Sequence, residues 1–135
     1  MPLQLDILTP QASTLSETVD GVTLPSANGE IGILPGHAAL ISALGAGVLA
    51  YTRGSETQRL VISGGFVEVK QDRVSVLAEV AEKAADIDAE KARAELQEAQ
   101  AELASWSGGD EETFTAAQTK LERAQARLQL TAGGR

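Results

Sequence analysis

Residues 61–88 read VISGGFVEVKQDRVSVLAEVAEKAADID, and the pattern of hydrophobic residues changes within this stretch. Apolar and polar residues alternate in FVEVK and VSVLAEV, which is typical of β-strands with one buried face. Gly64-Gly65 and Gln71-Asp72, which flank these runs, have the composition of tight turns. From residue 86 the alternation stops and a helical pattern begins. The sequence therefore predicts two domains, a β domain over residues 1–85 and a helical domain over residues 86–135.

The first 85 residues contain further short runs of the same kind. They are LQLDILT, VTLP, EIGIL, ALISAL, VLAYT and RLVIS. Turn-forming pairs such as Asp20-Gly21, Asn28-Gly29 and Gly54-Ser55 lie between them. Many short strands at this spacing predict an antiparallel β-sandwich or a flattened barrel.

The helical half consists of two segments joined by a short link. Residues 89–104, AEKARAELQEAQAELA, contain only strong helix formers. Asp86 or Asp88 can cap this helix, and Gly108-Gly109 is expected to end it. A second helix follows from about Asp110, with Gly133-Gly134 at its end. The short link predicts an antiparallel helical hairpin.

Apolar residues recur at steps of three and four in both segments, as expected for two helices that pack along one seam. The predicted seam of the first helix is Ala92, Leu96, Ala99, Leu103 and Trp106. The predicted seam of the second helix is Phe114, Ala117, Leu121, Ala124 and Leu128. A leucine of one helix can lie opposite an alanine of the other, with Leu103 beside Ala117 and Leu96 beside Ala124.

Charged residues repeat the same spacing beside each seam. The first helix carries Glu95, Glu98 and Glu102, and the second carries Lys120, Arg123 and Arg127. In an antiparallel pair these flanks meet, so we predict that Glu102 lies near Lys120 and Glu95 near Arg127. Exposed pairs of this kind contribute only ~0.2–1 kcal/mol each, so they specify orientation more than they hold the hairpin closed.

Composition excludes several classes of function. The 135 residues carry a net charge of −8, which argues against a nucleic-acid partner. The chain has no cysteine, so disulfides and thiolate chemistry are excluded. No apolar run approaches the ~18 residues that cross a bilayer, and MPLQLDILTP lacks the features of a secretion signal. We expect a soluble protein that faces the cytosol.

The only histidine, His37, lies in GEIGILPGHAAL at residues 29–40. A catalytic histidine needs a nucleophile, a metal partner or a paired carboxylate. The sequence contains no nucleophile elbow, phosphate loop or dinucleotide fingerprint. We therefore interpret His37 as part of a structural corner or an interface, and we expect no catalytic residue, metal or cofactor.

GEIGILPGHAAL, the stretch at residues 61–88 and the helical hairpin together resemble the epsilon subunit of rotary F-type ATP synthases. The resemblance covers essentially the whole chain, and MPLQLDILTP and DIDAEKA are most similar to the cyanobacterial and chloroplast branch. It implies an α+β fold, with an antiparallel β-sandwich of about ten strands before a two-helix domain. It also implies a non-catalytic rotor subunit that binds the gamma subunit and rests on the ring of c subunits.

The resemblance assigns roles to two groups of residues. Glu30, Ile31 and His37 fall on the part of the motif that lies at the rotor contact. Lys120, Arg123 and Arg127 correspond to basic residues that face the alpha and beta subunits when the hairpin extends and inhibits ATP hydrolysis. The implied location is peripheral, on the cytoplasmic or stromal face of a membrane such as a cyanobacterial thylakoid. An alanine-rich seam favours extension of the hairpin, because burial of an alanine methyl contributes little stabilising free energy.

Two alternatives to a rotor subunit stay open at the level of sequence. Some relatives bind ATP through a motif that here reads Ile87, Asp88, Lys91 and Ala92, with lysine in place of arginine. Lysine keeps the charge but loses the planar fork that makes bidentate contacts. The alternatives are therefore an ATP-binding sensor and a stand-alone adaptor whose sandwich binds another partner.

Overall fold

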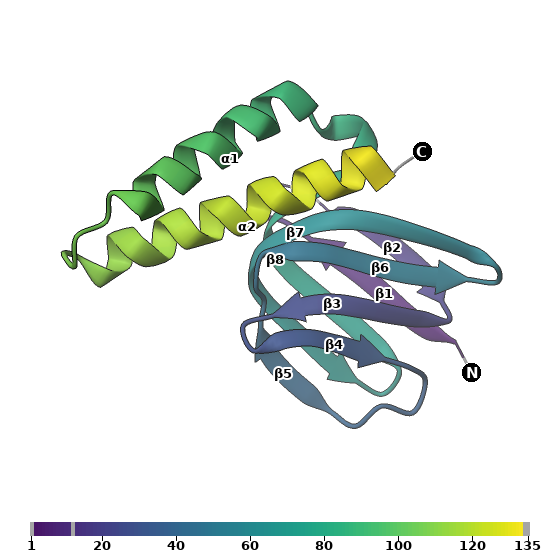
Figure 1. Cartoon of the computed structure of the whole chain (residues 1–135). Coiled ribbons are helices and arrows are strands. Elements are labelled where there is room, and N and C mark those ends of the chain that lie inside the picture. Colours follow the sequence, from purple (N-terminus) through teal and green to yellow (C-terminus); the bar gives the residue numbers. More distant parts are fainter. Residues whose placement is uncertain (1, 12, 134–135) are drawn as a thin grey trace.

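The computed structural model describes residues 2–11 and 13–133. Within these residues, eight strands precede a 3-10 turn and two helices (Figure 1). The strands are β1 (Leu3–Leu8), β2 (Ser13–Val19), β3 (Gly21–Ser26), β4 (Gly29–Ile33), β5 (Leu40–Ala43), β6 (Gly47–Arg53), β7 (Glu56–Lys70) and β8 (Arg73–Lys83). They are followed by η1 (Ala84–Asp86), α1 (Ala89–Ala104) and α2 (Glu111–Gly133). The predicted α+β class, a β-sandwich followed by two helices, is confirmed.

The two longest strands, β7 and β8, run through both layers of the sandwich. The first half of β7 pairs with β6 and its second half pairs with β5. β8 pairs with β7 along its length, and its first half also pairs with β1. One layer therefore contains β2, β1, β8, β7 and β5, and the other contains β8, β7, β6, β3 and β4 (Figure 1).

This arrangement corrects three expectations about the strands. RLVIS and FVEVK form one strand, because Gly64 and Gly65, with φ of 73° and 101°, bend β7 instead of reversing it. The described residues hence contain eight strands rather than about ten. β1 pairs with β8 in parallel, so the sandwich is not purely antiparallel. β2 was not predicted, because its apolar residues, Leu15 and Val19, are sparse.

The core lies between the two layers and contains alternate residues of the strands. On β7, Leu60 and Ile62 face the core before the bend, and Val67 and Val69 face it after the bend. The inward-facing positions thus change from even to odd numbers where the strand passes from one layer to the other. As a consequence, Val61 faces outward from the sandwich and is buried beneath α2.

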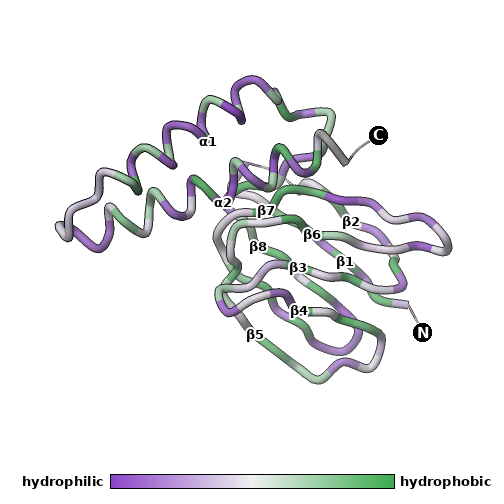
Figure 2. Tube along the Cα trace, in the orientation of Figure 1, coloured by the Kyte–Doolittle hydropathy of each residue, from purple (hydrophilic) through white to green (hydrophobic). Residues whose placement is uncertain are grey.

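The two helices form the predicted antiparallel hairpin, in which α2 lies against β6 and β7 while α1 packs on α2 (Figure 1). Hydrophobic and hydrophilic residues alternate along both helices (Figure 2). Along the predicted seam, the alanines are fully buried, whereas the leucines are only partly buried. The buried alanines are Ala92, Ala99, Ala117 and Ala124. Small side chains therefore set the distance between the helices.

The ends of the helices differ in part from the prediction. Asp88 caps α1, since its Oδ1 accepts hydrogen bonds from Glu90 N at 3.0 Å and Lys91 N at 3.2 Å. The helix ends at Ala104, with Ser105 as its C-cap, and does not continue to Gly108-Gly109. Trp106 consequently lies in the link and not in the helical seam. Gly134, predicted at the end of α2, lies outside the described residues.

We predict that Gly65→Ala destabilises the sandwich by about 3 kcal/mol or more. A Cβ at Gly65 would lie 1.8 Å from Leu77 O, and the φ of 101° is itself strained for alanine. Gly32→Ala is the matched control, because a Cβ there meets nothing within 4 Å. Urea unfolding measures both free energies, and equal stability of the two variants would contradict this account of the bend.

Candidate functional site

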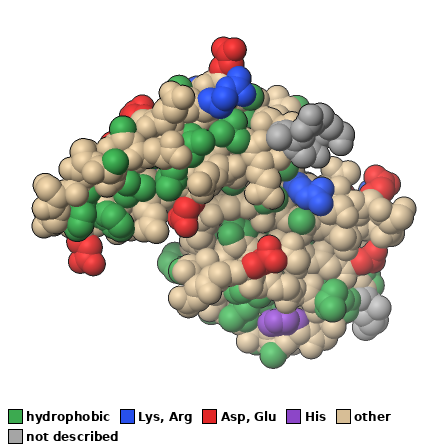
Figure 3. Space-filling model, viewed as in Figure 1, with side chains coloured by type: hydrophobic (Ala, Val, Ile, Leu, Met, Phe, Trp, Pro, Cys, Tyr) green, Lys and Arg blue, Asp and Glu red, His purple; other side chains and the backbone are tan. Residues whose placement is uncertain are grey.

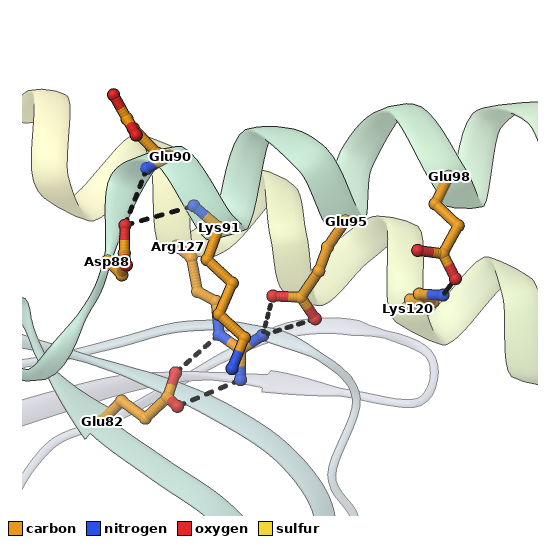
Figure 4. A network of polar contacts seen from close by, with 8 residues as sticks. All are labelled: Glu82, Asp88, Glu90, Lys91, Glu95, Glu98, Lys120 and Arg127. Atoms are coloured by element: carbon orange, nitrogen blue, oxygen red, sulfur yellow. Dashed lines mark hydrogen bonds and ion pairs between the residues drawn. The ribbon is translucent and has the colours of Figure 1, made fainter.

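Arg127 of α2 joins the hairpin to the sandwich. Its Nε and Nη2 donate hydrogen bonds to Glu82 Oε1 at 2.7 Å and Glu82 Oε2 at 3.0 Å (Figure 4). Its Nη1 donates to both carboxylate oxygens of Glu95 at 3.2 Å. Since Glu82 lies on β8 and Glu95 on α1, one guanidinium links three elements. The bidentate contact with Glu82 is the strong form of this interaction.

The ion pair of Arg127 is largely shielded from water. The exposed fractions of the side chains are 15% for Arg127, 28% for Glu82 and 24% for Glu95. Burial lowers the pKa of Arg127, but the hydrogen bonds and charges of Glu82 and Glu95 outweigh this effect and leave the pKa above its ordinary value. The guanidinium accordingly stays charged and keeps both partners.

Lys120 makes the second ionic contact of the hairpin. Its Nζ donates to Glu98 (Figure 4), and it also donates to Glu102 Oε1 at 3.2 Å. The predicted proximities of Glu102 to Lys120 and of Glu95 to Arg127 are both observed. The hydrogen bond from Lys120 lowers the pKa of Glu98. Both acids that pair with Lys120 lie on α1, so this contact holds the hairpin together without tying it to the sandwich.

A small apolar cluster lies beside the ionic contact. Val61, Ala126 and Leu130 are buried there, and Val48 and Ile87 pack partly buried against them. Ala126 and Leu130 were not among the predicted seam residues, whereas Leu128 was, and it is partly buried like the other leucines of the seam. Ala126 and Leu130 lie outside the seam because α2 has two buried faces, one toward α1 and one toward the sandwich.

A cavity of about 350 Å³ opens between η1, the start of α1 and the end of α2. Three residues of the predicted nucleotide motif, Ile87, Asp88 and Lys91, line it, together with Glu82, Asp86, Glu95, Arg123 and Arg127. The fourth residue of the motif, Ala92, is buried. Among the described residues, Arg123 Nε is buried without a hydrogen-bond partner. The carboxylate of Asp88 already caps α1.

The loop that contains His37 is fixed to the turn between β7 and β8. Gly36 N donates to Asp72 Oδ1 at 2.8 Å, and His37 N donates to Leu34 O at 3.1 Å. The imidazole Nδ1 lies 2.7 Å from Ala38 O. The part of the chain that the structure describes holds no cluster of three or more residues that could bind a metal. The contacts of this loop are thus made by backbone groups and by Asp72, and the interpretation of His37 as part of a structural corner or an interface stays a prediction.

The other two residues of the predicted rotor contact lie on β4, shortly before His37. Glu30 is exposed, whereas Ile31 is partly buried and packs against the core. Glu30 and Ile31 thus lie in the first three residues of an outer strand, and His37 lies in the loop that follows this strand. Glu30 is the member of this group that is open to a polar partner.

A row of exposed apolar side chains crosses three neighbouring strands. Phe66 of β7 pairs in register with Leu77 of β8, and Leu77 pairs with Leu8 of β1. Their exposed fractions are 58%, 54% and 38% in that order, and Ile41 on the adjacent strand β5 is 71% exposed. We call Leu8, Phe66 and Leu77 the apolar row. The apolar row was not predicted, because these residues can be placed side by side only when the strand register is known.

Hydrophobic side chains are also exposed at the tip of the hairpin (Figure 3). Trp106 and Phe114 pack there with their ring centroids 4.9 Å apart, and Trp106 remains 39% exposed. They line a cavity together with Leu103 and Ala117, two residues that were predicted to lie beside one another. None of the helices described here is long and apolar enough to cross a membrane.

Two family models match the chain. Residues 2–84 match the beta-sandwich domain of the ATP synthase delta/epsilon chain, and residues 85–132 match the long alpha-helix domain of the same chain. An ATP synthase epsilon chain 2 of Syntrophotalea carbinolica is 41% identical over 132 residues, which is 98% of this chain and 95% of the relative. The ATP synthase epsilon chain of Geobacter metallireducens is 41% identical over 128 residues, which is 95% of this chain and 92% of the relative.

A solved structure shows the same fold over the whole chain. It is a chain in the cryo-EM structure of the Euglena gracilis mitochondrial ATP synthase, described as OSCP/F1/c-ring, with a TM-score of 0.79 and 28% identity. The match covers 99% of this chain and 82% of that one. Neither of these two bacterial relatives is cyanobacterial, and neither the expected cyanobacterial and chloroplast branch nor a thylakoid location is supported.

Proposed function

This chain belongs to the ATP synthase delta/epsilon family as a non-catalytic epsilon subunit of the central stalk, and from that premise we propose two roles for its two parts. The sandwich, over residues 1–85, binds the gamma subunit and rests on the c-ring of the membrane-bound complex. The hairpin, over residues 86–135, leaves the sandwich, reaches the alpha and beta subunits and inhibits ATP hydrolysis. Association with the membrane is through the complex alone.

The apolar row supports the contact with gamma. Phe66 and Leu77 are more than half exposed and lie side by side on one face of the sandwich. Contiguous apolar side chains on a surface are typical of a protein interface. The row lies on the outer face of one layer, while α2 covers part of the outer face of the other. The sandwich can thus bind gamma whether or not the hairpin is docked.

The end of the sandwich near Glu30 and His37 is the proposed contact with the c-ring. The exposed carboxylate of Glu30 can accept hydrogen bonds from polar loops. The bond from Gly36 N to Asp72 keeps the loop of His37 fixed against the turn between β7 and β8. A fixed loop loses little conformational freedom on binding, which favours a stable contact.

The observation that carries the inhibitory role is the small size of the contact between α2 and the sandwich. Its apolar part consists chiefly of Val61, Ala126 and Leu130. Full burial of a valine or leucine contributes roughly 1.5–3 kcal/mol, and burial of an alanine methyl contributes much less. Docking of the hairpin is therefore worth only a few kcal/mol, which a partner that binds the extended state can offset.

We expect that Phe66→Ser weakens binding of gamma by about tenfold or more, since a few large side chains near the centre of an interface each contribute over about 1 kcal/mol. Leu34→Ser is the control. Leu34 is 67% exposed, but it lines a groove formed by β3, β4 and β6 and does not belong to the apolar row. Surface plasmon resonance with immobilised gamma measures both affinities. Unchanged affinity of Phe66→Ser would show that gamma binds elsewhere.

Reversal of charge at Lys120, Arg123 and Arg127 to glutamate should abolish inhibition of ATP hydrolysis in a complex with alpha, beta and gamma. ATP hydrolysis by this complex should rise to the rate measured with a chain that ends at residue 85, because the acidic partner surface would repel the altered helix. Arg93→Glu, which changes an exposed basic residue of α1, should retain inhibition. Intact inhibition by the triple variant would exclude the electrostatic part of the proposal.

The cavity beside Lys91 favours a second candidate function, that of a nucleotide sensor. Arg123, Arg127 and Lys91 supply three cations at its walls, although Glu82, Asp86, Asp88 and Glu95 surround them with acids. Calorimetric titration with ATP tests this function. A sensor gives saturable heat that is lost in Lys91→Gln and retained in Arg93→Gln, and absence of saturable heat in the unaltered chain excludes it.

A further inference from the structure

We infer that Glu82 is a built-in competitor for Arg127: it tethers the hairpin to the sandwich and so withholds Arg127 from an acidic partner surface. The inference rests on the proposed inhibitory function. It adds that a residue of the same chain regulates when the hairpin can inhibit. Glu82, a residue of the sandwich, would thus regulate the release of the hairpin. The two states of the hairpin then differ in which carboxylate binds the same guanidinium.

The hydrogen bonds of Arg127 support competition rather than simple attraction. Nε and Nη2 are both occupied by Glu82, and Nη1 is occupied by Glu95. The edge formed by Nε and Nη2 is one of those with which a guanidinium binds a carboxylate in bidentate fashion. A second carboxylate can use this edge only after Glu82 has left it. Binding to Glu82 and binding of an outside acid at this edge are hence mutually exclusive.

The location of the partners explains why Glu82 controls docking. Glu95 and Glu98 lie on α1 (Figure 4), as does Glu102, so all three move with the hairpin when it leaves the sandwich. Glu82 lies on β8 and stays behind. Within the described residues, Arg127–Glu82 is the ion pair that joins a helix to the sandwich. Loss of Glu82 thereby weakens docking while the ion pairs inside the hairpin remain.

The strand register couples this ion pair to the apolar contact. Glu82 pairs in register with Val61, and both side chains lie on the outer face of their layer. Val61 is buried under Ala126 and Leu130, which flank Arg127 in the sequence of α2. Lifting the end of α2 consequently breaks the ionic and the apolar contact together, and the hairpin is released as one unit.

Hydrogen exchange of the full chain tests the tether. In Glu82→Gln, the amides of α2 near residues 124–130 should exchange about tenfold faster than in the unaltered chain, because the charge-assisted bonds to Arg127 are lost. Glu98→Gln is the matched control, since Glu98 is an acid that pairs with Lys120 inside the hairpin. It should leave the exchange of α2 near residues 124–130 as it is in the unaltered chain. Equal exchange of α2 in Glu82→Gln and in the unaltered chain would overturn the tether.

Inhibition of ATP hydrolysis in the complex with alpha, beta and gamma tests the competition. Glu82→Gln should inhibit at a severalfold lower concentration than the unaltered chain. Arg127→Gln should loosen the hairpin to a similar extent but should not inhibit more strongly, because the cation that both surfaces require is gone. The competition would be overturned if both variants inhibited more strongly than the unaltered chain, or if Glu82→Gln did not.

The two measurements separate this inference from the function on which it rests. If removal of residues 86–135 leaves ATP hydrolysis unchanged, the proposed inhibitory function fails, and the competition fails with it. The exchange experiment still decides whether Glu82 tethers the hairpin, because it requires no other subunit. Faster exchange in Glu82→Gln would support the tether even in that case.

Discussion

The bend of β7 at Gly64-Gly65 is the constraint on which the other features depend. Because both glycines have positive φ, the strand passes from one layer to the other without a break. Its inward-facing residues are even-numbered before the bend and odd-numbered after it. This change turns Val61 outward and leaves Ile62 in the core. The partner strand β8 then presents Glu82 on the same outer face as Val61. The site that receives the hairpin is thereby a direct result of how the sandwich is closed.

The hairpin and its contact with the sandwich differ in the interactions that hold them. Inside the hairpin, four buried alanines bring the helices close together, and three acids of α1 pair with two cations of α2. Toward the sandwich, the contact consists of one small apolar cluster and one arginine. A body that is held together along its length but is held to its neighbour at one end is suited to move as a unit. This contrast gives the proposed inhibitory motion a physical basis in the chain itself.

Local patterns predicted the parts of the structure that depend on neighbours in sequence. The period of the hydrophobic residues identified both helices, Asp88 was one of two proposed caps, and the spacing of charges identified the pairs of Lys120 and Arg127 inside the hairpin. The same patterns could not reveal contacts that require the strand register. Glu82, Leu130 and the apolar row become functional candidates only when distant strands lie side by side. Gly64-Gly65 was interpreted as a turn because the composition of a turn and that of a bend are the same.

The position of Trp106 gives the molecule an optical property that follows from its shape. It is the only tryptophan of the chain, and it packs on Phe114 at the tip of the hairpin, with the indole Nε1 donating to Asp110 O at 3.3 Å. Light emitted on excitation of indole therefore originates at the end of the molecule that lies farthest from the sandwich (Figure 1). The colour and intensity of that emission describe the surroundings of the tip alone, so the unlabelled chain carries its own spectroscopic reporter of that end of the hairpin.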